Sequence, residues 1–225
     1  MSPRSAHPAV RTQLIEAAAR LLDAGGRQAL TTRRLAAEVG VSTMAVYTHF
    51  GGMDELVTEV VRESYARLGR ALACVPETTD PVADLMALCR AYRRNALANT
   101  SLYATMLGFT PTSDDQRWGA QALQAPLSAI RRCLASGRFR PAEPLLLAHQ
   151  AWCGVHGLVT LELGGYFFPP SLADQCFEAL LRDFAVGSGD TVEAAARSLE
   201  ASRSSRPGPA ASAVQVAGPA RDAAN

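Results

Sequence analysis

Apolar residues recur at intervals of three and four along most of the chain, which is the spacing of one face of an α-helix. Residues 11 to 24 give the first example, with Leu14, Ala18 and Leu21 on one face and Gly25-Gly26 as the expected stop. No run alternates apolar and polar residues with the period of two that indicates a strand. The pattern therefore predicts an all-α protein.

Residues 31 to 50 predict two short helices joined by a tight turn at Gly40-Val41. The second helix opens at Ser42, a residue type that caps helix N-termini, and its apolar residues Val46 and Phe50 share one face. The opposite face carries Thr43, Met44, Tyr47 and Thr48. Such a face, presented on a helix that packs across a glycine turn against its neighbour, is typical of a helix-turn-helix that reads the DNA major groove.

Beyond residue 52 the helical pattern continues, interrupted by glycine and proline. The expected helices span residues 53–73, 80–99, 101–107, 114–136, 142–165 and 171–186, and residues 190–201 could form a frayed helix. From Ser202 the composition shifts to Ser, Ala, Gly and Pro, which cannot bury enough apolar surface to offset the entropy of ordering. We therefore expect a DNA-binding domain over 1–52, a helical domain over 53–201 and a disordered tail over 202–225.

Two stretches resemble a known family. GVSTMAVYTHFGGMDELV, residues 40 to 57, resembles the DNA-binding module of the TetR-family transcriptional regulators, and the match extends over roughly residues 10 to 60. AWCGVHGLVTLELGGYF, residues 151 to 167, is similar to the Trp-His-Gly type of C-terminal domain in one branch of that family. The resemblance implies a three-helix DNA-binding domain followed by a helical domain for ligand binding and dimerisation.

The resemblance also implies which residues meet DNA. Thr43, Met44 and Thr48 would face base edges, whereas Tyr47 and His49 would reach phosphate. Arg33 and Arg34, in the first turn of the preceding helix, could clamp phosphate through charge-assisted hydrogen bonds or could be ordinary solvated arginines. The candidate DNA-binding residues are Thr32, Arg33, Arg34, Ser42, Thr43, Met44, Tyr47, Thr48 and His49.

Two departures from the family pattern affect this interface. Met44 stands where many relatives carry glycine, and it could contact a thymine methyl group or simply pack. Met53 stands where relatives commonly place a lysine that binds phosphate, so one backbone contact is in doubt. A surface helix with no partner is the alternative interpretation of the whole set.

Positive charge is concentrated at the start of the chain. Residues 1–52 hold six arginines against three acidic residues, a net charge of +3, whereas the remainder carries −2. A basic end on a near-neutral body fits a protein that contacts phosphate at one end only. All 22 basic residues are arginine, which we attribute first to the codon bias of a GC-rich genome.

In the C-terminal half, large or polar-tipped side chains stand on otherwise apolar helices. An effector cavity needs an apolar lining with a few placed polar groups, and these residues could supply it or could fill a core. The candidate ligand-binding residues are Tyr92, Tyr103, Met106, Trp118, Trp152 and His156, and Phe109 belongs to the same group. We expect an aromatic or largely apolar ligand with His156 as its polar anchor.

One stripe of the predicted helix 142–165 carries Gly154, Leu158, Leu161 and Gly165. Small residues at its ends permit close helix approach, which suits a seam between two copies of the chain, although packing within one chain could use the same stripe. We expect a homodimer formed mainly by this helix and the helix over 171–186.

Several other kinds of site are not expected. Five cysteines without a C-x-x-C pair favour reduced thiols in a cytosolic protein over a disulfide scaffold or a zinc finger. His149, Cys153 and His156 mimic metal-ligand spacing, but histidines bonded to carbonyls or to a second copy explain them without a metal. We therefore expect no metal and no cofactor. No apolar run approaches the length that crosses a membrane, so no membrane insertion is expected.

These observations predict a cytoplasmic, sequence-specific DNA-binding repressor that a small molecule releases from a near-palindromic operator. The resemblance implies that two recognition helices enter successive major grooves about 34 Å apart, and that a ligand moves the helix 53–73 so that this spacing is lost. A DNA-binding activator and a ligand-independent dimeric DNA-binding protein are the alternatives. An enzyme is not expected, because the chain has no G-x-S-x-G elbow and Cys153 near His156 lacks a third catalytic group.

Overall fold

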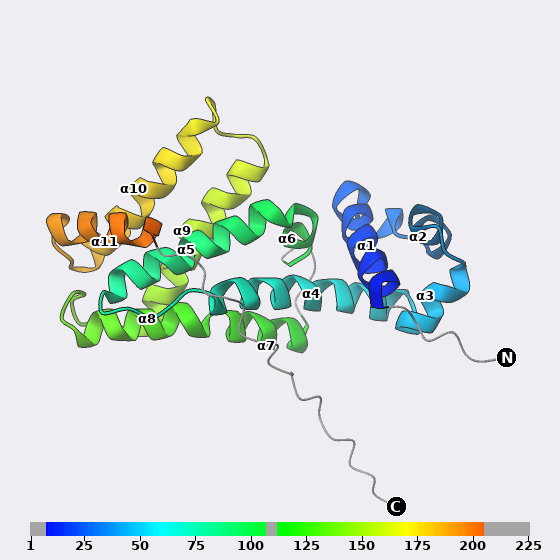
Figure 1. The fold of residues 1–225 in the computed structure, drawn as a ribbon, viewed down its shortest axis with the longest axis horizontal. Helices are drawn as coiled ribbons and strands as arrows, with labels where there is room; N and C mark the ends of the chain where they lie inside the picture. The colour runs from blue at the N-terminus through cyan, green and yellow to red at the C-terminus, as the bar shows by residue number, and fades with distance from the viewer. Residues whose placement is uncertain (1–7, 107–111, 205–225) are drawn as a thin grey trace, which may run out of the picture.

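The computed structural model describes residues 8–106 and 112–204, and all of its regular elements in those ranges are helices (Figure 1). The all-α prediction is confirmed there. The helices are α1 (Pro8–Ala29), α2 (Thr32–Val39), α3 (Thr43–Phe50), α4 (Met53–Ala73), α5 (Pro81–Ala98), α6 (Thr100–Met106), α7 (Ser113–Ala122), α8 (Gln124–Ala135), α9 (Pro144–Leu163), α10 (Ser171–Ser188) and α11 (Val192–Ser204). Phe109 lies outside the described residues.

The helices pack around two separate apolar cores. The first holds α1, α2 and α3 together, with Leu14, Leu35 and Val46 fully buried, so the periodicity of this region identified its inward faces correctly. The second joins α5, α8, α9, α10 and the C-terminal half of α4. Figure 1 shows α4 running from beside α1 and α3 into the larger bundle. This long helix therefore belongs to both parts of the molecule.

The helix expected over 114–136 is two helices, because the chain breaks at Leu123 between α7 and α8. Pro126 explains the break: it has no backbone N–H to offer the carbonyl of Ala122, four residues earlier. The apolar spacing continues across this point, which is why the pattern alone predicted one helix. α9 likewise begins at Pro144 rather than residue 142, with Glu143 accepting a hydrogen bond from the backbone N–H of Leu146.

The helix is interrupted at Gly25-Gly26 as expected, since both residues have non-helical backbone angles, and α1 spans two helical segments joined by this kink. Gly26 has a positive φ of 63°, a backbone conformation that glycine adopts without a side-chain clash, and helical residues follow it up to Ala29. Near the other end of the described residues, most of the expected 190–201 segment forms a helix, α11, which begins at Val192. It continues to Ser204, and Ser202 is buried against α5, where its Oγ accepts a hydrogen bond from Arg90 Nε at 3.0 Å. The first residues assigned to a tail are therefore part of the folded domain, and residues 205–225 lie outside the described ranges.

None of the helices in the described residues is both long enough and apolar enough to cross a membrane.

Candidate nucleic-acid interface and ligand cavity

The outward face of α3 is exposed as the sequence predicts. Val46 and Phe50 are buried in the N-terminal core, and Thr43, Met44, Tyr47 and Thr48 all lie on the solvent side. The Met44 side chain is 67 % exposed, so in this structure it does not pack against the protein, which leaves it available to a thymine methyl group. The turn before α3 depends on Gly40, whose φ of 75° ends α2 in the left-handed conformation.

The polar groups of Ser42, at the N-cap of α3, and of Thr48 and His49 within it differ in how many contacts they already make within the protein. Ser42 occupies the N-cap position, but its side chain makes no capping hydrogen bond, so the expected cap is present in position only. Thr48 Oγ1 donates to the carbonyl of Met44 at 2.8 Å, which leaves its oxygen as an acceptor. His49 is half-buried, with its ring centroid 6.0 Å from that of Phe50. Ser42 is therefore the least committed of these three side chains.

Arginines of the N-terminal part fall into two groups. Arg11, Arg20 and Arg27 form ion pairs with Glu59, Glu38 and Asp54 respectively. Arg33 and Arg34 are exposed at the start of α2, and neither forms an ion pair within residues 8–106 and 112–204. Thr31 caps this helix by accepting a hydrogen bond from the backbone N–H of Arg34. The two unpaired guanidinium groups thus stand at a capped, positive helix end, next to Thr32, where phosphate binds favourably.

A cavity of about 500 Å³ lies inside the larger bundle, which is the size range of small-molecule sites. Helices α4 to α9 all contribute to its wall, and most of the wall is apolar. Five of the six expected ligand-binding residues line it: Tyr92, Tyr103, Met106, Trp152 and His156.

Trp118 is the exception. Its ring lies against Tyr65, with ring centroids 6.3 Å apart, and Tyr65 lines the cavity in its place. Tyr65 was missed because it stands on α4, which the sequence pattern presents as an amphipathic connector. His149, Gln116 and Gln124 are further polar residues of the wall that sequence reasoning did not assign to it.

The polar centre of the cavity is His156. Its Nδ1 lies 2.6 Å from the hydroxyl of Tyr103 and 3.0 Å from that of Tyr92, while its Nε2 lies 3.5 Å from Thr160 Oγ1. Burial lowers the pKa of His156, which favours the neutral imidazole, and burial raises the pKa of Tyr92 and of Tyr103, which keeps both phenols protonated. Three uncharged groups that can donate and accept hydrogen bonds therefore converge on one point of an apolar wall.

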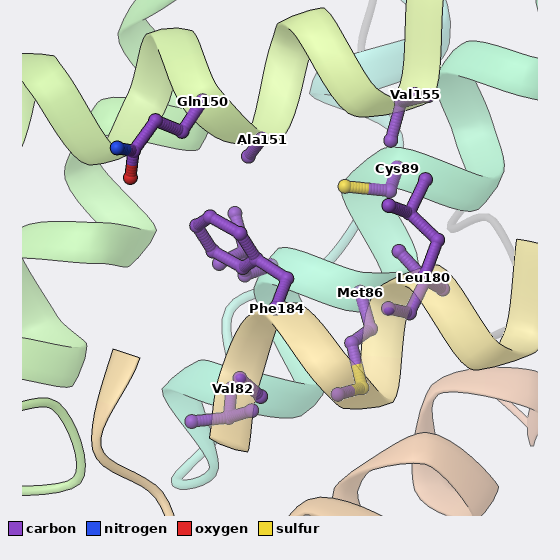
Figure 2. A pocket seen from close by; sticks show the side chains of 11 residues that line it. Val82, Met86, Cys89, Gln150, Ala151, Val155, Leu180 and Phe184 are labelled. Carbon is purple, nitrogen blue, oxygen red and sulfur yellow. The ribbon is translucent and has the colours of Figure 1, made fainter. Parts of the chain in front are cut away.

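A second gap, of only about 20 Å³, lies between α5, α9 and α10 (Figure 2). Figure 2 shows the ring of Phe184 facing Ala151 across it. Cys89 borders both this gap and the large cavity, and burial raises the pKa of its thiol to about 12, so the thiol is unreactive at neutral pH. A space of this size holds about one water and is a packing gap.

The metal-like spacing on α9 serves other contacts. His149 Nδ1 donates to the carbonyl of Leu145 at 2.8 Å, and His156 Nδ1 faces the two tyrosines. Cys153 is a free, exposed thiol. Within the described residues, no three side chains of the ligating types are grouped to hold a metal ion.

Two residues of the stripe expected to join two copies are packed inside their own chain. Gly154 packs on Leu180 of α10, and Leu158 is only 9 % exposed in the core of its own chain. Gly165 is exposed but lies beyond the end of α9, so Leu161 is the one exposed member within the helix. An uncharged side of α9, here called the outer face, consists instead of the exposed Leu146, Gln150, Cys153 and Leu161 and the half-buried Gly157. Gly154 and Leu158 of the expected seam therefore pack within their own chain, and the outer face lies about one residue of helix rotation from them.

Helix α6 connects the cavity to the N-terminal core. Leu102 is buried among the residues of α1 and α4, and the next residue, Tyr103, is the one bonded to His156. Ser64 of α4 donates to the carbonyl of Leu102, with 2.9 Å between the oxygens. A movement of the α6 backbone at Tyr103 would therefore also move Leu102, which is a residue of the N-terminal core.

An arginine strengthens the same junction. Arg67 of α4 donates to Glu16 of α1 at 2.8 Å, to Asn99 before α6 at 2.7 Å and to Glu63 within α4 at 3.0 Å. The Arg67 side chain thus links α1, α4 and the residue before α6 where the two cores meet.

Known proteins share this organisation. Residues 14–60 match the family model described as bacterial regulatory proteins, tetR family, and residues 85–184 match that of a tetracyclin repressor-like C-terminal domain. The HTH-type transcriptional regulator BetI of Brucella canis is 30 % identical over 112 residues, which are 48 % of this chain and 57 % of BetI. The chain thus spans little more than half the length of this relative.

Two further similarities cover more of the chain. The nucleoid occlusion factor SlmA of Aliivibrio fischeri is 29 % identical over 163 residues, which are 67 % of this chain and 82 % of SlmA. A solved structure of a protein with unknown function from Rhodococcus sp. RHA1 has a TM-score of 0.69 at 26 % identity and covers 84 % of this chain and all of the Rhodococcus chain. Both domains described above are therefore matched, in the same order, and the chain belongs to the TetR family of transcriptional regulators.

Proposed function

We propose that the protein is a homodimeric, sequence-specific DNA-binding repressor that a small molecule in the α4–α9 cavity releases from its operator. The observation that carries DNA binding is the coincidence of an exposed α3 face with the unpaired Arg33 and Arg34 at the start of α2. Bases are read by side chains in the groove, and phosphate contacts fix the position of the protein on the duplex. The exposed face of α3 would read the bases, and the two arginines of α2 would contact phosphate.

Two copies would join through the outer face of α9. This face is uncharged and mostly apolar, with Gln150 as its polar residue, and a Cβ built on Gly157 meets no atom within 4 Å, so a second helix can approach closely there. A twofold dimer presents two α3 helices, and a near-palindromic operator matches that symmetry.

Release would run through α6. A ligand that displaces Tyr103 from His156 also displaces Leu102, and with it the contact between α6 and the core of α1 to α3. A ligand shifts such an equilibrium only by its difference in affinity for the two states, so strong release needs a preference of about 100-fold or more.

The direct test of this function is DNase footprinting on DNA that co-purifies with the protein, repeated with uncharged aromatic and aliphatic compounds. A palindromic footprint that a compound abolishes supports the repressor mechanism. Trp152→Ala, which removes a ring from the cavity wall, should retain the footprint and lose the response. A footprint that no compound changes would favour a ligand-independent DNA-binding protein.

Tyr47→Ala is expected to weaken operator binding by about 1–3 kcal/mol, the scale of one good contact, without unfolding the protein. Tyr47 is 48 % exposed, so its removal leaves the core intact. The measurement is a titration of labelled operator followed by fluorescence anisotropy, with an unrelated duplex of equal length as the control. Unchanged operator affinity in a Thr43→Ala, Tyr47→Ala double variant would show that α3 does not read the DNA.

A further inference from the structure

Apart from His149 and His156, the described residues that line the large cavity include no side chain that can carry a positive charge. Lysine is absent from the whole chain, and no arginine belongs to the wall. A carboxylate or phosphate placed inside would lose its hydration without meeting a counter-charge, which is strongly unfavourable. The cavity is therefore unsuited to an anionic molecule.

The wall is also unsuited to a cation. Asp115 is its one acidic residue, and Asp115 Oδ2 already accepts hydrogen bonds from the backbone N–H of Thr112 at 2.7 Å and from Thr112 Oγ1 at 2.8 Å. This carboxylate also stands in the first turn of α7, where the positive end of the helix dipole stabilises its charge. Hydrogen bonds and the helix dipole thus already stabilise this carboxylate without a cation.

At the polar centre of the wall, the hydroxyls of Tyr92 and Tyr103 share His156 Nδ1 as their near acceptor, and the Tyr103 hydroxyl also lies 3.5 Å from the backbone carbonyl of His156. A neutral imidazole has one nitrogen that accepts and one that donates. If His156 Nδ1 accepts, the two phenol hydroxyls of Tyr92 and Tyr103 share it, and if it carries the proton, neither hydroxyl can donate to it. In either tautomer at least one phenol hydrogen is not bonded to Nδ1, and the backbone carbonyl of His156, 3.5 Å from the Tyr103 hydroxyl, is a long contact that the acceptor oxygen of a ligand could replace.

We propose that the occupant of the effector site assigned above is an uncharged molecule with a carbonyl oxygen and an apolar body. The oxygen accepts a hydrogen bond from Tyr92 or Tyr103, and the body lies against the leucine-rich wall formed by α4, α5 and α8. This inference rests on the proposed function for the place of the site, and it adds the chemical class of the ligand.

Four molecules of nearly equal shape test the class. They are 4-butylacetophenone, a ketone; 1-butyl-4-ethylbenzene, its hydrocarbon counterpart; 4-butylbenzoate, an anion; and 4-butylbenzylamine, a cation. Affinities are measured on the full-length protein by isothermal titration calorimetry at pH 7.5, with quenching of tryptophan fluorescence as a second readout. We expect the ketone to bind about three- to tenfold more tightly than the hydrocarbon, the value of one net hydrogen bond, and at least about 100-fold more tightly than either ion.

Tyrosine-to-phenylalanine variants locate the hydrogen bond. The Tyr92→Phe, Tyr103→Phe double variant should reduce the ratio of ketone to hydrocarbon affinity to about one while leaving the hydrocarbon affinity within twofold. Tyr65→Phe is the matched control, because Tyr65 lines the same cavity, its ring lies against Trp118, and its hydroxyl is not among the groups bonded to His156 in the described residues. It should leave the ratio unchanged.

The outcomes separate this inference from the proposed function. Tighter binding of the benzoate or the benzylamine, or an affinity ratio that survives the double variant, overturns the carbonyl class even if another compound releases the operator. If the ketone binds as expected but the operator footprint does not respond to it or to any other compound, the class holds and the release mechanism fails. Absence of binding by all four molecules overturns the inference.

Discussion

A Leu161→Arg variant should be a folded monomer whose affinity for a palindromic operator is about 10²- to 10⁴-fold lower than that of the unchanged protein. Leu161 is 47 % exposed on the outer face of α9, so a single chain can accommodate the arginine in water. In a dimer joined through this face, the guanidinium would lose its hydration without an acidic partner on the same face. Loss of the dimer removes the second α3 helix, and with it the gain from binding two half-sites at once.

Light scattering and operator titration on the same preparation measure the two effects together. Val192→Arg is the matched control, because Val192 is a similarly exposed apolar residue on α11. The control should be indistinguishable from the unchanged protein in mass and in affinity. A Leu161→Arg protein that stays dimeric would place the seam on another surface.

Leu158 illustrates where the sequence pattern was insufficient. The stripe through Gly154 and Leu158 has the residue types of a helix–helix contact, and it is one, but its partner is α10 of the same chain. Leu158→Glu should consequently lower the stability of the monomer instead of separating two copies. α9 is apolar nearly all round, so its periodicity does not tell which face is covered from within.

The N-terminal region was predictable because its signals are local. Gly40, the Thr31 cap and the four-residue spacing of Val46 and Phe50 each act within a few residues, and together they determine which side of α3 faces water. The cavity depends on long-range packing instead. The sequence indicated which side chains are large enough to line it, but only the path of α4 beside α7 decides that Tyr65 reaches the cavity and Trp118 does not.

The arginines of the N-terminal domain show the same difference between what the local sequence indicates and what contacts in the folded structure decide. The sequence marked Arg33 and Arg34 by their place in the first turn of a helix, whereas the structure distinguishes them from Arg20 and Arg27 by the acidic partners of the latter. A guanidinium already paired with a carboxylate adds little net attraction for phosphate. The two unpaired arginines should therefore account for most of the arginine-dependent affinity of this domain.

An Arg33→Gln, Arg34→Gln double variant should bind its operator on the order of 10²- to 10³-fold more weakly near 0.15 M salt, because a dimer loses four phosphate contacts. The slope of log affinity against log salt should become shallower by about three to four, since each contact releases about one counterion. The loss should be nearly equal for operator and unrelated DNA, because phosphate contacts carry no base information. Titrations at four or more salt concentrations measure all three quantities.

The control for this pair is an Arg20→Gln, Arg27→Gln double variant, which removes the same formal charge from two exposed, ion-paired positions of the same domain. Because those guanidinium groups are neutralised by Glu38 and Asp54, the salt slope should change by less than about one. Equal losses in the two double variants would mean that the overall field of the domain, and not the position of Arg33 and Arg34 at the start of α2, attracts the DNA. If the slope of log affinity against log salt becomes shallower only in the Arg33→Gln, Arg34→Gln variant, the phosphate backbone lies at the N-terminus of α2, within reach of the exposed face of α3.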